Sequence, residues 1–255
     1  MRLTLDRILP SSPVLPAATP CLLCLAPGEP LLCSECEWDL PYLARYANRC
    51  RQCALPLASD ADYCGDCLRD PPDFDVCRAA FTYEYPLDGL IHRFKYRRQL
   101  SAGRALGDML AQHLLVERET VPNDVWPEWL IPVPMHWSRR LVRGFNQAEL
   151  LATDLGKALD LPVHPLCRRQ RRTRAQQGLS RRARQKNLQA AFRLTARGHQ
   201  CVPHRRVALV DDVVTTGQTA RILAGLLKRA GAASVDIWTL ARTPETATAA
   251  DPGSP

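Results

Sequence analysis

From residue 79 onward, short apolar runs alternate with longer stretches in which apolar residues recur every three or four positions. The first pattern is typical of strands and the second of amphipathic helices. Strands are expected at residues 79–85, 129–134, 163–167, 207–210 and 235–240, and helices at residues 87–94, 102–119, 147–159 and 218–230. Because strands alternate with helices, the pattern predicts an α/β domain.

One strand is followed by a distinctive set of polar residues, in the stretch VALVDDVVTTGQTA at residues 207–220. Asp211 and Asp212 come directly after the apolar run, and a small-residue turn then opens a helical pattern. Ligands bind at the carboxyl ends of strands in open α/β sheets. Adjacent carboxylates can accept hydrogen bonds from the vicinal hydroxyls of a sugar, so Asp211 and Asp212 are assigned to ribose binding.

The turn after the two acids has the composition of a phosphate site. Gly217 lets the backbone approach an anion, and the amides of a turn that runs into a helix N-terminus point at that anion. The expected phosphate-binding residues are Thr215, Thr216, Gly217, Gln218 and Thr219. In the structural alternative, Thr215 or Thr216 simply caps the next helix. A P-loop is excluded by the missing Gly-Lys-Ser/Thr ending, and a dinucleotide fingerprint by the missing glycines.

The N-terminal part of the chain is rich in paired cysteines. Four CxxC pairs occur there: Cys21 with Cys24, Cys33 with Cys36, Cys50 with Cys53, and Cys64 with Cys67. Two thiolates in one tight turn can bind the same metal ion, and four thiolates complete a tetrahedral zinc site. The pairs therefore predict two structural Zn²⁺ sites, with the first two pairs in one site and the last two in the other. Crossed pairing of non-consecutive turns is the alternative to this sequential assignment.

Other uses of the paired cysteines fit the sequence less well. A disulfide framework needs an export signal, and the charged and proline-interrupted N-terminus provides no continuous apolar segment for one. A redox CxxC is a single motif between a strand and a helix, whereas here four pairs repeat. Four thiolates also close the coordination sphere, so these metals are expected to stabilise the fold and not to catalyse.

Composition and proline content indicate how the chain is divided. With 46% hydrophobic residues the protein is globular, and consecutive prolines at residues 71 and 72 indicate a linker. The expected division is a double zinc ribbon at residues 1–70, an α/β domain at residues 71–243 and a disordered tail at residues 244–255. No apolar run approaches membrane-spanning length, so the protein is expected to be cytoplasmic and not inserted in a membrane.

Charge is distributed unevenly along the chain, whose net charge is +8. Residues 1–77 carry 6 Lys/Arg and 11 Asp/Glu, a net charge of −5, and the remainder carries 28 and 15, a net charge of +13. Between Asp160 and Asp211 there are 13 basic residues and no acid. Such a one-sided run repels itself without an anionic partner, which favours a phosphate-rich ligand or a nucleic acid.

Part of this basic region has few apolar anchors. Residues 168–192 contain 9 basic side chains, and a helix start is expected at Ser180. We interpret this segment as a flexible basic loop that a ligand orders, and its candidate contact residues are Arg172, Arg174, Arg181 and Arg182.

Several motifs together resemble a known family. Residues 207–220 resemble the ribose-phosphate signature of type I phosphoribosyltransferases, in which a hydrophobic strand leads into two acids and a small-residue phosphate loop. The four CxxC pairs, FKYRRQL at residues 94–100, RRLVRGFNQAELLA, RTRAQQGLSRRARQKNLQAAF and the stretch at 207–220 occur in this order. The combination resembles the ComF family, which includes the GntX proteins, from about Cys21 to Arg242.

The resemblance implies a type I phosphoribosyltransferase-like parallel sheet with an N-terminal double zinc ribbon. It implies binding of phosphoribosyl pyrophosphate or a nucleotide, with Mg²⁺ on the pyrophosphate. The loop at residues 135–147, after the first sheet strand of that domain, is then expected to receive the pyrophosphate through Arg139, Arg140, Arg143 and Gly144. The sequence assigns no catalytic residue and no acceptor-binding residue, so transferase activity is left open.

The resemblance also implies a role in natural competence, the uptake of single-stranded DNA. The alternative to a ribose-phosphate enzyme is a non-catalytic adaptor. In that reading the basic segment tracks a single-stranded backbone, and the ribbons contact a partner such as a DNA-uptake helicase.

Overall fold

The computed structural model describes residues 20–27, 31–170 and 190–244. The cysteine-rich part contains α1 (Ser34–Trp38), the 3₁₀ helix η1 (Leu43–Arg45) and α2 (Gly65–Arg69). The strands of the remainder are β1 (Val76–Thr82), β2 (Trp129–Pro132), β3 (Cys167–Arg169), β4 (Phe192–Leu194), β5 (Arg206–Val214) and β6 (Ser234–Arg242). Its helices are α3 (Leu87–Tyr96), α4 (Leu100–Thr120), α5 (Trp137–Arg143), α6 (Gln147–Leu159), α8 (Ala196–Cys201) and α9 (Gln218–Arg229).

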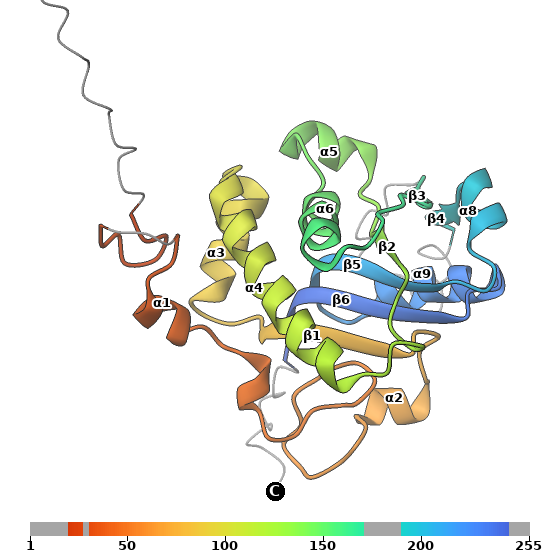
Figure 1. Ribbon diagram of the computed structural model, residues 1–255, viewed down its shortest axis with the longest axis horizontal. Coiled ribbons are helices and arrows are strands. Elements are labelled where there is room, and N and C mark those ends of the chain that lie inside the picture. The colour runs from red at the N-terminus through yellow and green to blue at the C-terminus, as the bar shows by residue number, and fades with distance from the viewer. Residues whose placement is uncertain (1–19, 28–30, 171–189, 245–255) are drawn as a thin grey trace, which may run out of the picture.

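A four-stranded sheet in the order β1-β6-β5-β2 forms the centre of the molecule (Figure 1). Every neighbouring pair in it is parallel, which confirms the predicted α/β class. The strand predicted at residues 207–210 is longer than expected, since β5 continues to Val214. Asp211 and Asp212 therefore lie within the strand and not after it, and Asp211 is in register with Thr239 of β6.

Alternate residues of the strands point to opposite faces of the sheet, as strand geometry requires. Ala208 and Trp238 belong to the core shared with α3, α4 and α6, whereas Leu209 and Ile237 belong to the core shared with α9. Figure 1 shows α4 and α6 on the near side of the sheet and α9 behind it. Two hydrophobic cores, one on each face, hold the strands in place.

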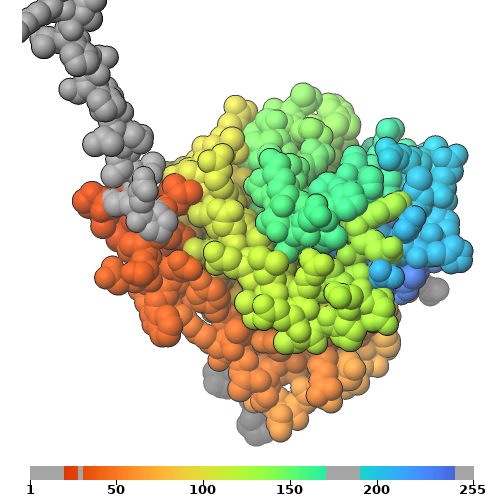
Figure 2. Space-filling model, viewed as in Figure 1, coloured from red at the N-terminus to blue at the C-terminus, as the bar shows by residue number. Residues whose placement is uncertain are grey.

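The cysteine-rich part packs against the α/β domain at both of these cores. Cys21 and Leu40 contribute to the core of α3 and α4, and Cys50 and Cys53 contribute to the core of α9. Figure 2 shows this part lying directly against the rest of the molecule. The domain boundary at residue 70 stays a prediction, but the packing joins the two parts through apolar contacts.

Two local predictions are wrong. The strand expected at residues 163–167 is absent, since Val163 forms only an isolated bridge to Leu130. The strand begins at Cys167 instead, because β3 pairs antiparallel with β4. The loop expected at residues 135–147 contains the helix α5, which His136 caps by accepting a hydrogen bond from the Ser138 amide. The predicted helix start at Ser180 and the tail from residue 245 lie outside the described residues.

Among residues 20–27, 31–170 and 190–244, none of the helices combines the length and apolar character needed to span a bilayer.

Candidate functional site

The loops after β2 and β5 lie side by side, because these two strands pair in parallel. β5 leads into the turn of Thr215, Thr216 and Gly217, and α9 begins at Gln218. Gly217 has a φ of 71°, in the left-handed region that glycine adopts without strain. Gly217 is also the N-cap of α9, and no side chain caps the helix there. The Thr216 hydroxyl only accepts a long hydrogen bond of 3.4 Å from the Gln218 amide.

The position of Gly217 argues against the alternative in which Thr215 or Thr216 only caps α9. A capping threonine would stand at the N-cap position itself, and here that position is occupied by glycine. The first turn of α9 thus begins at the sheet edge with backbone amides and threonine hydroxyls in the same turn. The assignment of residues 215–219 to a phosphate stays a prediction.

The two carboxylates differ in their partners. Asp212 is buried, at 9% exposure, and its Oδ2 lies 3.0 Å from the Nζ of Lys95. Asp211 Oδ1 accepts a hydrogen bond of 2.9 Å from the Asp212 amide. Burial, and then the adjacent charge of Asp212, raise the pKa of Asp211 to about 8. The Lys95 ammonium thus faces Asp212, whereas the surroundings of Asp211 favour its protonated form.

Lys95 comes from the last turn of α3. α3 buries Leu90, Ile91 and Phe94 against the sheet, and Lys95 follows directly after Phe94. The ion pair with Asp212 joins this helix to the strand that carries the candidate site. No local pattern in the sequence identifies this pair, because the two residues are far apart along the chain.

The four residues of the predicted pyrophosphate loop lie on α5 and at its end. Arg140 forms a salt bridge of 3.0 Å with Glu149, and Arg143 donates to Gln147 at 3.3 Å and to the Tyr96 hydroxyl at 3.1 Å. Gly144 ends the helix with a φ of 88°. These contacts hold Arg140 and Arg143 against neighbouring elements.

Arg139 has a different environment. The pKa of Arg169 is lowered first by burial and then by the nearby charge of Arg139, while Asp211 acts in the opposite direction. Arg139, Arg169 and Asp211 therefore belong to one electrostatic neighbourhood. The sequence pattern did not indicate Arg169. It indicated the basic-loop residues Arg172, Arg174, Arg181 and Arg182. Those four lie outside the described residues.

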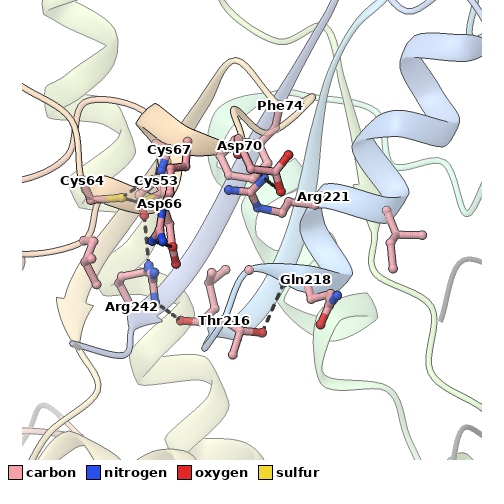
Figure 3. Close-up of a pocket in the computed structure, with 15 residues that line it drawn as sticks. Cys53, Cys64, Asp66, Cys67, Asp70, Phe74, Thr216, Gln218, Arg221 and Arg242 are labelled. Carbon is pink, nitrogen blue, oxygen red and sulfur yellow. Dashed lines mark hydrogen bonds and ion pairs between the residues drawn. The ribbon is translucent and has the colours of Figure 1, made fainter. Parts of the chain in front are cut away.

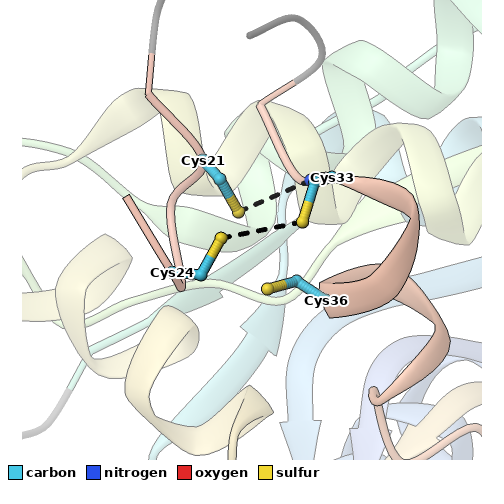
Figure 4. A group of neighbouring side chains, drawn as sticks. All are labelled: Cys21, Cys24, Cys33 and Cys36. Atoms are coloured by element: carbon cyan, nitrogen blue, oxygen red, sulfur yellow. Dashed lines mark hydrogen bonds between the residues drawn. The ribbon is translucent and has the colours of Figure 1, made fainter. Parts of the chain in front are cut away.

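The eight paired cysteines form two groups of four. The first group is Cys21, Cys24, Cys33 and Cys36 (Figure 4), and the second is Cys50, Cys53, Cys64 and Cys67. In each group the ligand atoms all lie within 4.8 Å of one another. This grouping confirms the sequential assignment. All of the described cysteines are free thiols.

The thiol positions fit a tetrahedral metal ion. A Zn–S bond of about 2.3 Å gives an S–S edge of about 3.8 Å in a tetrahedron. The Sγ atoms of Cys24 and Cys33 are 3.7 Å apart, and those of Cys53 and Cys64 are 3.6 Å apart. Burial, and then the neighbouring Cys50 and Cys64, raise the pKa of Cys53 to about 11, and a bound cation would favour its thiolate form.

The two groups differ in burial. In the second group all four cysteines are buried, whereas in the first Cys24 is exposed and Cys33 and Cys36 are half-buried. Solvent and chelators thus have easier access to the first group.

Comparison with known proteins places the chain among competence-related proteins. Competence protein F of Haemophilus influenzae is 37% identical over 83% of this chain and 90% of that protein. DNA utilization protein YhgH of Escherichia coli K12 is 37% identical over 88% of this chain and 96% of that protein. Competence protein ComFC of Bacillus subtilis is 28% identical over 87% of this chain and 88% of that protein. No family model matches the chain.

Among solved structures, the purine phosphoribosyltransferase of Pyrococcus horikoshii overlaps 59% of this chain and 79% of that chain, with 19% identity and a TM-score of 0.35. The order and direction of the strands, and not this structural similarity, establish the α/β fold.

Proposed function

The chain belongs to the family of competence protein F and DNA utilization protein YhgH, and from this premise we propose that its α/β domain binds phosphoribosyl pyrophosphate or a related ribose-phosphate. The observation that carries the proposal is the sequence of groups along β5 and the start of α9. Two carboxylates are followed by a threonine turn, and a glycine at φ 71° opens a helix.

Each part of the ligand has a matching part of the site. The 5-phosphate accepts hydrogen bonds from the backbone and hydroxyls of residues 215–219. Asp211 and Asp212 accept hydrogen bonds from the ribose hydroxyls. Lys95, Arg139 and Arg169 supply positive charge near these carboxylates, where the pyrophosphate of the ligand adds negative charge.

The same groups suit loss of pyrophosphate from the anomeric carbon. As the bond from that carbon to the pyrophosphate oxygen breaks, negative charge grows on the leaving group, and the cations Arg139 and Arg169 stabilise it. Mg²⁺, which binds pyrophosphate oxygens, would neutralise further charge. Asp212, held by Lys95, fixes the ribose while this happens. No described residue is assigned to an acceptor, so the proposal is ribose-phosphate binding with the chemistry of a phosphoribosyltransferase.

We also propose that both cysteine groups hold structural Zn²⁺. The donor set is four thiols in each, and the S–S separations match a tetrahedral site. Four thiolate ligands leave no open position for a substrate, so the metal stabilises the fold. Because the thiols must stay reduced to bind zinc, a cytoplasmic location is proposed with it.

Single-stranded DNA is a second candidate ligand, favoured by the names of the relatives and by the 13 basic residues between Asp160 and Asp211. In this version the domain acts in competence or DNA utilization, with a DNA-uptake helicase as the proposed partner. When arginines bind the phosphates of a DNA strand, counterions are released, so the affinity for single-stranded DNA must fall steeply as the salt concentration rises. An affinity for single-stranded DNA that is independent of salt would contradict this candidate.

A thermal-shift screen separates the two ligands. The zinc-loaded chain is melted with phosphoribosyl pyrophosphate and Mg²⁺, with ribose 5-phosphate, with nucleotides, and with short single-stranded DNA. A ligand that binds only the folded state raises the melting temperature according to its affinity and concentration. We expect a rise with phosphoribosyl pyrophosphate that is lost in Asp212→Asn and kept in Asp108→Asn, a control that removes an exposed carboxylate of α4.

A further inference from the structure

Arg242, the last residue of β6, lies between the second cysteine group and the threonine turn (Figure 3). It is buried, at 7% exposure, although it carries a full positive charge. Its Nε donates to the Cys53 carbonyl at 3.1 Å. Its Nη1 donates to the carbonyls of Val214 at 3.2 Å, of Thr243 at 2.8 Å, and of Thr215. One guanidinium thus touches a metal-ligand residue and the residues that open the phosphate turn.

The contact with Thr215 sets the direction of the turn. In a trans peptide the C=O and the following N–H point in opposite directions. Holding the Thr215 carbonyl toward Arg242 therefore points the Thr216 N–H away from Arg242. Since the Thr216 amide belongs to the proposed phosphate turn, Arg242 controls a donor of that turn without contacting the phosphate.

The contact with Cys53 places a positive charge beside the second cysteine group. A divalent cation with four thiolate ligands has a net charge of 2 − 4 = −2, so a buried cation next to it is favourable. The four hydrogen bonds that Arg242 donates within the described residues all go to backbone carbonyl oxygens. In that part of the chain no carboxylate forms an ion pair with it. The metal-loaded cysteine group is then the countercharge that its burial requires.

We propose that Arg242 is a positioning residue that couples metal binding at Cys50, Cys53, Cys64 and Cys67 to ligand binding at the turn of residues 215–219. This inference rests on the proposed function, because the ligand of the turn is the ribose-phosphate. Coupling between two sites is reciprocal. Phosphoribosyl pyrophosphate protects the second cysteine group, and metal in that group strengthens binding of phosphoribosyl pyrophosphate.

A second contact between the same two parts of the chain offers a matched control. Arg221 of α9 pairs with Asp70, just after α2, at 3.3 Å. Asp70 is largely exposed, and exposed ion pairs contribute little. Both arginines line the cavity of about 470 Å³ between the second cysteine group and the turn. Arg221→Gln therefore removes a bridging arginine from this junction and leaves Arg242 in place.

The test uses the full zinc-loaded chain and measures the alkylation rate of each cysteine by mass spectrometry, with and without phosphoribosyl pyrophosphate and Mg²⁺. In the wild type we expect the ligand to slow alkylation of the second cysteine group and to leave the first group unchanged. In Arg242→Gln the second group reacts faster, the ligand no longer protects it, and the ligand Kd rises about 2- to 30-fold. Arg242→Lys gives an intermediate result, and Arg221→Gln behaves as the wild type.

The possible failures are distinguishable. If the wild type does not bind phosphoribosyl pyrophosphate, the proposed function is contradicted, and the coupling is contradicted with it. If the wild type binds but Arg242→Gln keeps the same Kd and the same protection, only the role of Arg242 is contradicted. A residue with a purely structural role lowers the melting temperature and leaves the ligand protection intact. Should Arg242→Gln fail to fold by circular dichroism, the folded Arg242→Lys decides the question, since partial loss of protection supports the coupling and full protection contradicts it.

Discussion

Asp211 and Asp212 are adjacent in β5, yet their surroundings differ. Asp212 is paired with Lys95 at 3.0 Å, while burial and the charge of Asp212 raise the pKa of Asp211 to about 8. Two adjacent carboxylates, one half-buried and one buried, disfavour each other's ionised form. A ribose hydroxyl can both donate a hydrogen bond to a carboxylate and accept one from a protonated carboxyl group. Such a pair of side chains therefore suits a ribose that carries Mg²⁺-bound pyrophosphate.

The raised pKa of Asp211 predicts a pH dependence of stability. The folded state keeps a proton that the unfolded state loses above its ordinary pKa of 3.8, so this residue's contribution to stability is fully present below that pH. The contribution is lost as pH rises toward about 8. The side chain of Asp211→Asn stays neutral at every pH in this range. The free energy of unfolding of this variant should therefore rise relative to that of the wild type between pH 5 and pH 8. Urea unfolding at several pH values measures this, and parallel curves for the two proteins would refute it.

Lys95 is predicted to stabilise the fold through Asp212. Lys95→Met leaves a buried carboxylate without its cation, which should cost about 1–3 kcal/mol of the free energy of unfolding at pH 7. Lys157→Met, which removes an exposed lysine of α6, is the control and should change little. A double-mutant cycle with Asp212→Asn isolates the pair, and a coupling energy of zero would show that the ion pair has no net effect.

At the scale of elements, the turn between β5 and α9 depends on Gly217. Its φ of 71° is unfavourable for any residue with a Cβ, although open space surrounds the position apart from Val214 at 3.8 Å. The chain therefore needs glycine here for its backbone conformation and not for lack of room. If the turn binds a phosphate as proposed, its conformation is already set before the ligand arrives.

Gly217→Ala is predicted to lower the free energy of unfolding by about 1–2 kcal/mol and to weaken binding of ribose 5-phosphate. Gly89→Ala is the matched control, because Gly89 lies in helix α3 with no atoms near the position of a Cβ. The control should gain about 0.5–1 kcal/mol from helix propensity. Chemical denaturation and titration calorimetry measure the two effects. Equal stability changes in the two variants would contradict the role of the turn.

The two cysteine groups are predicted to lose metal in a fixed order. Cys24 is exposed and Cys33 and Cys36 are half-buried, whereas the second group is entirely buried. A chelator under reducing conditions should therefore empty the first group before the second. Mapping alkylated cysteines during zinc release measures the order, and proteolysis should reveal unfolding of the cysteine-rich part. Simultaneous release, or an unchanged digestion pattern after metal removal, would contradict this prediction.

Sequence patterns anticipated those features that depend on neighbours along the chain. The helix at residues 147–159 follows from its apolar spacing, and the cysteine groups follow from the CxxC spacing. The ion pair of Lys95 with Asp212 and the contacts of Arg242 depend on tertiary packing, so no local pattern indicated them. The antiparallel pairing of β3 with β4 was missed because both strands have only three residues and lie far apart along the chain.

For the whole molecule, the cysteine-rich part and the sheet form a continuous structure. The first cysteine group contributes to the core on one face of the sheet, and the second contributes to the core on the other. Arg242 adds a polar connection between the second group and the turn after β5. Metal loss from the cysteine groups is therefore expected to weaken ligand binding at the candidate site, which lies at the carboxyl end of β5 in the same sheet.

The central claim is that the carboxyl-terminal end of β5 and the turn after it bind a ribose-phosphate. Calorimetric titration of the zinc-loaded chain with phosphoribosyl pyrophosphate and Mg²⁺ tests this most directly. We predict saturable binding to one site per chain, abolished in the double variant Asp211→Asn/Asp212→Asn and retained in Asp108→Asn. Absence of binding in the wild type, or equal binding in the double variant, would contradict it.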